Sequence, residues 1–338
     1  MTKPSWGIVC TVDAPADLIV AHAAHHLAAG ASEVNYFLDT PQPEALARLA
    51  GVPGCKLTQC DAAYWRQEMN YVPLMHQVRQ RRNATWTSER SAADYLIHLD
   101  IDEFLWQFRP LADELRELPA GAYLSIANVE RVFAPGDRFD RLITPLFRVP
   151  DRHYEGEAPA PNFDAEGLTR FGVTGHAAGK SATPRGHGYI LGIHRPRYPG
   201  TGEKHYPPRR LSETSAILHF DGMTRRDWVF KLIRKAAVLA SNPKATTTDL
   251  RMTQIAVLTA SGSDRAAAEA LHDRLKCLTP EREAELRAAD RLIEARLDLE
   301  AAVARLLPEA TLDLSAAAYD RWLAERKGAL FARYGLDE

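Results

Sequence analysis

The sequence has few of the features that mark disulfide-rich, zinc-binding or membrane-spanning proteins. Its 338 residues contain only four cysteines, with no CxxC pair and no zinc-ligand spacing: Cys10, Cys55, Cys60 and Cys277. Their scatter fits reduced thiols in a cytoplasmic protein. No apolar run reaches the roughly 18 residues that a membrane-spanning helix requires, and the first residues lead into a predicted strand without a signal-peptide core. We therefore expect a cytoplasmic location, with peripheral contact to the inner face of the membrane left open.

The chain also lacks a strong charge of either sign. Its 42 basic and 44 acidic residues give a net charge of −2 at pH 7, so the overall charge does not indicate a nucleic-acid partner. One quarter of the residues are charged and 46% are apolar, which is ordinary for a globular protein. At this length the chain can bury a large core and form one or two domains.

The first 130 residues alternate between predicted strands and helices. Residues 6–12 are a β-branched run that predicts a strand, 18–29 predict a helix with Asp17 as its N-cap, and 33–38 predict a second strand. This order predicts a βαβ unit and a parallel sheet with a right-handed crossover. Further elements are expected as helices at 43–50, 63–89 and 111–118, and as strands at 55–60, 95–99 and 122–129. We therefore expect a three-layer α/β domain with a mostly parallel sheet.

The stretch 94–106 contains the most informative motif. An apolar run at 95–99 stops at Asp100, Asp102 and Glu103. Three carboxylates at the end of a buried strand repel one another, which raises their pKa values unless a cation neutralises them. On a continuing strand Asp100 and Asp102 would point to the same side, where they could hold one hard divalent cation. The alternative is a solvated strand end or a helix cap.

Asp39 is a second acidic residue at the end of a predicted strand, the one at 33–38. Ligands in parallel α/β sheets bind at the carboxyl ends of the strands. We therefore expect Asp39 to share one crevice with Asp100 and Asp102.

Basic residues gather at two places in the chain. On the predicted helix at 63–89, three arginines are expected to form a solvated face: Arg79, Arg81 and Arg82. Residues 180–210 carry seven lysines and arginines against the single acid Glu203, which indicates a bound anion or compensation of the acidic stretch. The five prolines and five glycines of this segment predict a loop that closes over a phosphate, and the alternative is an exposed, disordered loop.

The remaining segments differ in pattern. Residues 133–178 are typical of loops and short antiparallel strands, and 216–220 predict an apolar strand that carries His219. A lone histidine of this kind is also typical of packing. An amphipathic helix is expected at 224–240, and 245–338 are almost wholly helical in pattern.

These patterns predict two domains. The first, at 1–240, combines a nucleotide-binding half at 1–130 with an acceptor and loop half at 131–240. The second is a C-terminal helical region at 241–338, which we expect to serve packing, partner binding or self-association.

Several motifs together resemble a known enzyme family. The run from Leu99 to Leu105 is similar to the D-x-D-E-F signature of family-2-like glycosyltransferases with the GT-A fold. The pair His25-His26 followed by Gly30 resembles the HH…G of this family's first helix. A later succession resembles the family's K…HRP…H-[YF]…K order: Lys180, His194-Arg195-Pro196, His219-Phe220 and Lys231. The resemblance covers about residues 6–235 and implies a GT-A-like nucleotide-binding domain.

The resemblance implies roles for individual residues. Asp100 and Asp102 would face a Mn²⁺ or Mg²⁺ ion bound to the diphosphate of a nucleotide sugar, with His219 as a further metal or diphosphate ligand. Asp39 would contact uridine or ribose. Phosphate contacts would come from three residues: Lys180, His194 and Lys231. The sequence departs from the family's pattern at two segments that contact the nucleoside: Ala14-Pro15, and the run at 40–43.

The implied activity is transfer of a sugar from a nucleotide-sugar donor, expected to be a UDP-sugar, to a glycan, a lipid-linked or another acceptor. Inverting members of the family use a carboxylate to deprotonate the acceptor hydroxyl, while the metal stabilises the departing diphosphate. Glu130 and Asp137, which follow the predicted strand at 122–129, are the expected bases, and Glu103 ranks below them. The alternative for each is a surface carboxylate.

Other functions are compatible with the same residues. A metal phosphohydrolase would use the acidic stretch, but the DxDx[TV] nucleophile pattern is missing because Glu103 occupies that neighbourhood. A non-catalytic nucleotide-sugar or carbohydrate-binding protein on a transferase scaffold would bind the donor without turnover. Nucleic-acid binding by 180–210 has the least support, although this segment carries Tyr189, Tyr198 and Tyr206.

Overall fold

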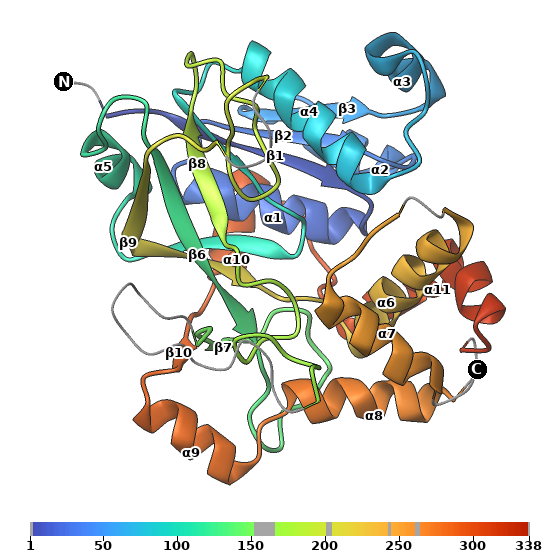
Figure 1. Ribbon diagram of the computed structural model, residues 1–338. Helices are drawn as coiled ribbons and strands as arrows, with labels where there is room; N and C mark the ends of the chain where they lie inside the picture. The colour runs from blue at the N-terminus through green and yellow to red at the C-terminus, as the bar shows by residue number, and fades with distance from the viewer. Residues whose placement is uncertain (1–2, 152–165, 201–204, 243–244, 261–263, 337–338) are drawn as a thin grey trace. The chain divides into compact units, whose positions relative to one another are not determined.

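The computed structural model describes residues 3–151, 166–200, 205–242, 245–260 and 264–336 (Figure 1). The chain divides into two compact units. The first comprises Met1–Asn128, Ala178–Ile217 and Leu297–Leu312, and the second comprises Val129–Ala177, Leu218–Arg296 and Asp313–Glu338. Residue 240, where a domain boundary was expected, lies inside the second unit, at the end of a helix. The expected division into two domains stays a prediction.

A mixed sheet with a parallel core forms the first unit. Its strand order is β6-β8-β4-β1-β2-β3, and the strands are β1 Trp6–Val12, β2 Glu33–Leu38, β3 Cys55–Gln59, β4 Tyr95–His98, β6 Tyr123–Arg131 and β8 Lys180–Pro184. The strands β4, β1, β2 and β3 are parallel to one another, whereas β8 is antiparallel to β4 and β6. Every residue of β1 and β2 is buried, as in parallel strands covered on both faces. The predicted α/β class is confirmed.

Helices cover this sheet, and their ends follow from the sequence. They are α1 Ala16–Ala28, α2 Pro43–Leu49, α3 Ala62–Met69, α4 His76–Arg90, α5 Leu111–Arg116 and α10 Leu299–Leu306. The chain leaves α1 through Gly30, whose φ of +103° suits a residue without a side chain. The N-cap of α1 is Pro15 rather than the predicted Asp17, which lies in the first turn. Packing on α1 involves α10, through Ala302 and Val303.

Three sequence predictions in this unit need correction. The helix expected at 63–89 is two helices, because Asn70 ends α3 with a left-handed φ of +63° and Pro73 follows it. The segment expected as a loop from 180 begins with β8, which is buried throughout because it pairs on both sides. Residues 201–204 of that segment lie outside the described residues. The strand expected at 216–220 is the longer β9 Arg209–His219, which pairs with β5 Glu103–Gln107.

The second unit combines short antiparallel strands with a helical core. The end of β6 pairs with β7 Leu146–Arg148, which pairs with β10 Leu292–Glu294. The helices are α6 Arg225–Ser241, α7 Asp249–Ala260, α8 Arg265–Lys276, α9 Pro280–Ala288 and α11 Ala316–Arg333. One apolar core joins α6, α7, α8 and α11 through Trp228, Ile255, Leu271 and Leu323. The predicted helical character of the C-terminal region is confirmed.

Among the helices of the described residues, none combines the length and apolarity needed to cross a bilayer.

The predicted loops at 133–178 contain β7, and residues 152–165 of that range lie outside the described part of the chain.

Candidate functional site

Carboxylates stand at the carboxyl ends of three neighbouring parallel strands in the first unit. Asp13 follows β1, Asp39 follows β2, and Asp100 lies two residues beyond β4. The Asp39 N–H donates to the Val12 carbonyl at 2.9 Å, which places Asp13 and Asp39 side by side at the sheet edge. We call Asp13, Asp39, Asp100 and Asp102 the carboxylate edge. Ligands of open α/β sheets bind outside this end of the strands.

Asp100 and Asp102 lie in a tight turn, so the expectation that they continue a strand is wrong. The Glu103 N–H donates to the Asp100 carbonyl at 3.1 Å, and the Asp100 N–H donates to Glu103 Oε2 at 2.8 Å. The Glu103 side chain therefore closes the turn before β5 begins. Asp102 is buried, whereas 31% of the Asp100 side chain is exposed. Asp100 is thus the member of the motif that faces solvent.

A fully buried lysine neutralises this turn. Lys180 Nζ lies 2.8 Å from Asp100 Oδ2 and 2.7 Å from Glu103 Oε2. Burial acts to lower the pKa of Lys180, but the two carboxylates outweigh it and raise this pKa above its usual value. Burial would likewise raise the pKa of Asp100, and the Lys180 charge holds it well below its usual range instead. Lys180 was predicted to bind phosphate, and here it orients the acidic motif.

One polar face of α4 borders the carboxylate edge. Arg79 Nη2 donates to Asp39 Oδ2 at 2.7 Å, Gln80 Nε2 donates to Asp100 Oδ1, and Asn83 Nδ2 donates to Thr11 Oγ1 at 2.8 Å. These positions recur at three- and four-residue spacing, so they share one side of the helix. Burial acts to raise the pKa of Asp39, but hydrogen bonds from His76 and Arg79 lower it below its usual value.

The expected solvated arginine face of α4 is therefore wrong for two of its three members. Arg79 binds Asp39, and Arg82 Nη2 donates to Glu68 at 2.7 Å. Arg79 also donates to the backbone carbonyls of Pro73 and Leu74, at 2.8 and 3.2 Å. A guanidinium carries enough donors to hold a carboxylate and a loop at once, which a helical pattern alone does not reveal.

Three histidines of α1 hold β5 in place. His22 Nε2 donates to the Glu103 carbonyl at 3.0 Å, and His25 Nε2 donates to the Leu105 carbonyl at 2.6 Å. His26 Nε2 accepts the Leu105 N–H at 3.1 Å, so this imidazole must be neutral. Burial lowers the pKa of all three, to about 3 for His22. We call His22, His25 and His26 the histidine clasp.

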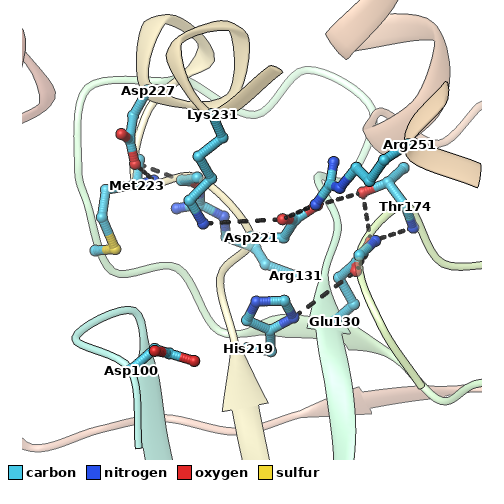
Figure 2. A network of polar contacts seen from close by, with 12 residues as sticks. Asp100, Glu130, Arg131, Thr174, His219, Asp221, Met223, Asp227, Lys231 and Arg251 are labelled. Atoms are coloured by element: carbon cyan, nitrogen blue, oxygen red, sulfur yellow. Dashed lines mark hydrogen bonds and ion pairs between the residues drawn. The ribbon is translucent and has the colours of Figure 1, made fainter. Parts of the chain in front are cut away.

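The second unit contains a separate buried polar network around Glu130 (Figure 2). Glu130 lies inside β6 rather than after the strand as expected. Its Oε1 accepts the Thr174 N–H at 2.7 Å and lies 3.2 Å from Lys276 Nζ, and its Oε2 accepts the Gly175 N–H at 2.7 Å. Burial acts to raise the pKa of Glu130, but the charge of Lys276 and the bond from Thr174 lower it. Both carboxylate oxygens are thus supplied with donors.

Asp221 is the second acid of this network. Its Oδ1 lies 2.8 Å from Arg251 Nη2 and 3.8 Å from Lys231 Nζ (Figure 2). Its Oδ2 lies 3.5 Å from Lys276 Nζ. Burial would raise the pKa of Asp221, but these cations hold it well below its usual range. One carboxylate therefore serves three cations from α6, α7 and α8.

The remaining predicted site residues lie in different settings. His219 Nδ1 is 3.9 Å from Glu130 Oε2, and its ring centroid is 4.8 Å from that of His176. His194 Nδ1 donates to the Gly179 carbonyl at 3.0 Å in the first unit. Asp137 is exposed and closes a turn, where its Oδ2 accepts the Ala134 N–H at 2.8 Å. The metal, phosphate and base roles of these residues stay predictions.

Several residues of the two sites were missed in the sequence. Asp13 could have been found, because it follows β1 as Asp39 follows β2. Asp221 could also have been found, because it directly follows the predicted strand at 216–220 and precedes Gly222, which is a common position for an acid at the end of a strand. Arg251 and Lys276 gave no signal, since they lie in helices already rich in basic residues.

The fold and the first site define an α/β protein whose parallel strands end in carboxylates. No family model matches the chain, and no curated protein matches it. Several solved structures show a distant likeness, and three of them serve as examples. HddC from Yersinia pseudotuberculosis has 7% identity and a TM-score of 0.34 over 64% of this chain and 93% of its own.

The other two structures are named as transferases. A mannose-1-phosphate geranyltransferase from Thermus thermophilus has 10% identity and a TM-score of 0.25, over 46% of this chain and 47% of its own. The glycosyltransferase GlyE of Streptococcus pneumoniae also has 10% identity and a TM-score of 0.25, over 99% of this chain and 63% of its own. The case for a function therefore rests on the residues of the site.

Proposed function

We propose that this protein is a metal-dependent, GT-A-like glycosyltransferase that moves a sugar from a nucleotide-sugar donor to a glycan, a lipid-linked or another acceptor. The observation that carries this proposal is the carboxylate edge, where three adjacent parallel strands each end in an acid. A divalent cation can link the diphosphate of a nucleotide to such an edge. The carboxylates and the phosphates are both negatively charged, so they repel each other unless a cation lies between them.

The residues of the acidic turn fit a hard divalent cation. Carboxylate oxygens are the ligands that Mn²⁺ and Mg²⁺ prefer, and the side chain of Asp100 is both oriented and partly exposed. Asp100 and Asp102 would hold the ion, and His219 is the proposed additional ligand. When bound, such an ion would neutralise the charge that develops on the leaving diphosphate.

The other residues would bind and orient the donor. Lys180 and Gln80 fix the orientation of the Asp100 carboxylate. Lys180 would therefore contribute to phosphate binding indirectly, by orienting the acidic turn that would hold the cation. Asp39 is the proposed contact to uridine or ribose, and Arg79 fixes its orientation. Further phosphate contacts are proposed for His194 and Lys231.

Glu130 and Asp137 are the carboxylates to test as the base that deprotonates the acceptor. The donors on both oxygens of Glu130 lower its pKa, and a weaker base is a less efficient proton acceptor. These donors favour a structural role for Glu130, in which its carboxylate holds the backbone at Thr174 and Gly175. The exposed Asp137 has the simpler access to an acceptor hydroxyl.

A second candidate is a nucleotide-sugar-binding protein without turnover. The ion pairs already present at the carboxylate edge favour this candidate, since Arg79 pairs with Asp39 and Lys180 pairs with Asp100. Turnover of the donor distinguishes the two, and release of phosphate without an acceptor would indicate a phosphohydrolase.

The test is UDP release from a panel of UDP-sugars by the full chain, with and without Mn²⁺. We expect Mn²⁺-dependent release that falls by about 10²-fold or more in Asp102→Asn, because one of the two carboxylates that would hold the cation beside the leaving diphosphate is lost. Asp113→Asn is the matched control, because it removes the same charge from a surface pair with Lys3. Equal rates in Asp102→Asn and the wild type would overturn the proposal, and donor binding without release would support the second candidate.

A further inference from the structure

The segment that joins α3 to α4 exposes three apolar side chains to solvent. The exposed fractions are 53% for Tyr71, 46% for Val72 and 87% for Leu74. We call these three residues the apolar tip. Single apolar residues scattered over a surface are normal, whereas several on one short loop form a patch of the kind that marks an interaction site.

The helices on either side of the apolar tip are fixed to each other. Arg82 Nη2 of α4 donates to Glu68 Oε2 of α3 at 2.7 Å. Trp65 of α3 and Ala84 of α4 belong to one buried apolar cluster. The apolar tip therefore ends a well-packed helical pair, and its side chains are presented to solvent by a supported backbone.

Arg79 connects the apolar tip with the carboxylate edge. Its Nη1 donates to the carbonyls of Pro73 and Leu74 at 2.8 and 3.2 Å, and its Nη2 donates to Asp39 Oδ2 at 2.7 Å. One guanidinium thus holds both the backbone of the tip and an acid of the proposed donor site. Whatever binds the apolar tip is placed beside that edge.

Positive charge accompanies the apolar tip. Residues 62–88 contain four arginines against the single acid Glu68. Two of the four form ion pairs: Arg79 with Asp39 and Arg82 with Glu68. The other two are Arg66 in the last turn of α3 and Arg81 in the second turn of α4. Among the described residues, no carboxylate lies within ion-pair distance of either, so their charge is available to an anionic partner.

We propose that the apolar tip docks on an anionic lipid surface, with Arg66 and Arg81 facing the headgroups. Val72 and Leu74 have no polar group to offer a sugar or a nucleobase, and they gain free energy only by leaving water. Tyr71 suits the boundary of a bilayer, because its ring is apolar and its hydroxyl is polar. Apolar side chains flanked by arginines are the combination that binds proteins to such surfaces.

Docking on lipid goes beyond the proposed transfer reaction, because it needs neither a metal nor a donor. Its consequence for the acceptor rests on the proposed function: a lipid surface at the apolar tip would present a lipid-linked acceptor beside the carboxylate edge. Vesicle binding in the presence of a chelator and without any nucleotide sugar is therefore measured separately from UDP release.

Co-sedimentation of the full chain with phosphatidylglycerol vesicles tests the apolar part of the proposal. Leu74→Ser should weaken binding about tenfold or more, because a largely exposed leucine loses its transfer out of water. Met252→Ser is the matched control, because it removes an apolar side chain that is 50% exposed on α7. It should bind like the wild type. Thermal unfolding of Leu74→Ser should match the wild type, since this side chain is 87% exposed.

The electrostatic part is tested by Arg81→Gln and by the composition of the vesicles. Arg81→Gln should weaken binding about fivefold, the effect of one arginine near an anionic surface. Arg90→Gln is the control on the same helix, because Arg90 lies at the far end of α4 and pairs with Glu89 at 2.9 Å. Binding to phosphatidylcholine vesicles should be weaker than to phosphatidylglycerol vesicles, and added salt should reduce the difference.

Three results would overturn the proposal. One is the absence of wild-type binding to phosphatidylglycerol vesicles. Another is wild-type affinity in both Leu74→Ser and Arg81→Gln. The third is a dimer of the wild type that Leu74→Ser abolishes, found without vesicle binding, because it would assign the apolar tip to a second copy of this chain.

Discussion

The two units of this protein use carboxylates in opposite ways. In the first unit the acids stand at strand ends, and Asp100 keeps 31% of its side chain exposed while Lys180 and Gln80 orient it. In the second unit Glu130 and Asp221 are almost fully buried, and both oxygens of each are supplied with donors. The first arrangement leaves a carboxylate available to a ligand. The second fixes backbone and cations.

This contrast explains why the same residue type supports different roles. A carboxylate that accepts several bonds from its own protein is already neutralised, and adding a metal would break those bonds. Asp100 also has a donor on each oxygen, Gln80 on Oδ1 and Lys180 on Oδ2, but 31% of its side chain is exposed, so it can gain a further cation at lower cost. We therefore propose ligand binding at the carboxylate edge, and we expect Glu130 and Asp221 to have a structural role.

The largest expected effect is on the buried lysine of the first unit. Lys180→Met should lower the free energy of unfolding by about 3–5 kcal/mol, because it leaves the fully buried Glu103 carboxylate without its cation. Urea unfolding measures this loss. Lys56→Met is the control, since its pair with Glu33 is on a lysine that is 54% exposed and should contribute about 0–1 kcal/mol. Equal losses in the two variants would contradict the account of the acidic turn.

The corresponding change in the second unit is Asp221→Asn. Asparagine tolerates the φ of +40° at this position, so the substitution isolates the charge. We expect a loss of about 2–3 kcal/mol, because Arg251, Lys231 and Lys276 lose their shared anion. Asp290→Asn offers a matched control with a φ of +54° at an exposed position, and it should change stability by less than about 0.5 kcal/mol. A loss no larger than that of the control would show that Asp221 does not hold the cations.

Acid should weaken the first unit through the histidine clasp. The folded pKa values of these histidines lie below the unfolded value of about 6.5, so the unfolded chain binds more protons in this range. Their contribution is complete above about pH 6.5 and is lost as pH falls toward the folded pKa, which is about 3 for His22. The slope is up to about 1.4 kcal/mol per pH unit for each histidine.

Hydrogen exchange resolves this acid effect by unit. The Leu105 amide of β5 should lose protection as pH falls from 6.5 to 4.5, after correction for intrinsic exchange. His26 of the clasp accepts a hydrogen bond from this amide directly. In the second unit, His272 on α8 also has a lowered pKa, of about 4, so amides there provide the comparison. His26→Gln should flatten the pH dependence at Leu105. Unchanged dependence in that variant would remove the clasp as its cause.

The smallest expected effect concerns Asp39. Arg79→Gln should cost about 1–2 kcal/mol of stability and raise the pKa of Asp39 toward its usual value, because a charged donor is lost. Carbon-detected NMR titration of the Asp39 carboxyl measures the change. Arg82→Gln, which removes a pair with Glu68, should leave the Asp39 pKa as it is. A shift of equal size in both variants would mean that Arg79 does not act through its direct bond.

The sequence predicted the parallel core because each strand is a continuous apolar run bounded by turns. It also located Asp39 and Asp100, since acids at strand ends stand out against such runs. It did not reveal that Asp100 and Asp102 occupy a turn, because the bond that closes this turn comes from the Glu103 side chain. Local pattern carries no information on such a bond.

Long-range pairing explains the other misses. Lys180 reads as part of a basic loop, and it becomes a buried partner of Asp100 only because β8 pairs with β4. Arg251 and Lys276 read as ordinary helical cations, and Asp221 gathers them from α7 and α8. Contacts between residues far apart in the chain decided both cases.

The proposed metal site at Asp100 and Asp102 is tested most directly by an anomalous difference map of crystals soaked with Mn²⁺ and UDP. We expect a manganese peak within coordination distance of Asp100 and Asp102, with the diphosphate on its other side. Bound UDP without a manganese peak at these two carboxylates would contradict it.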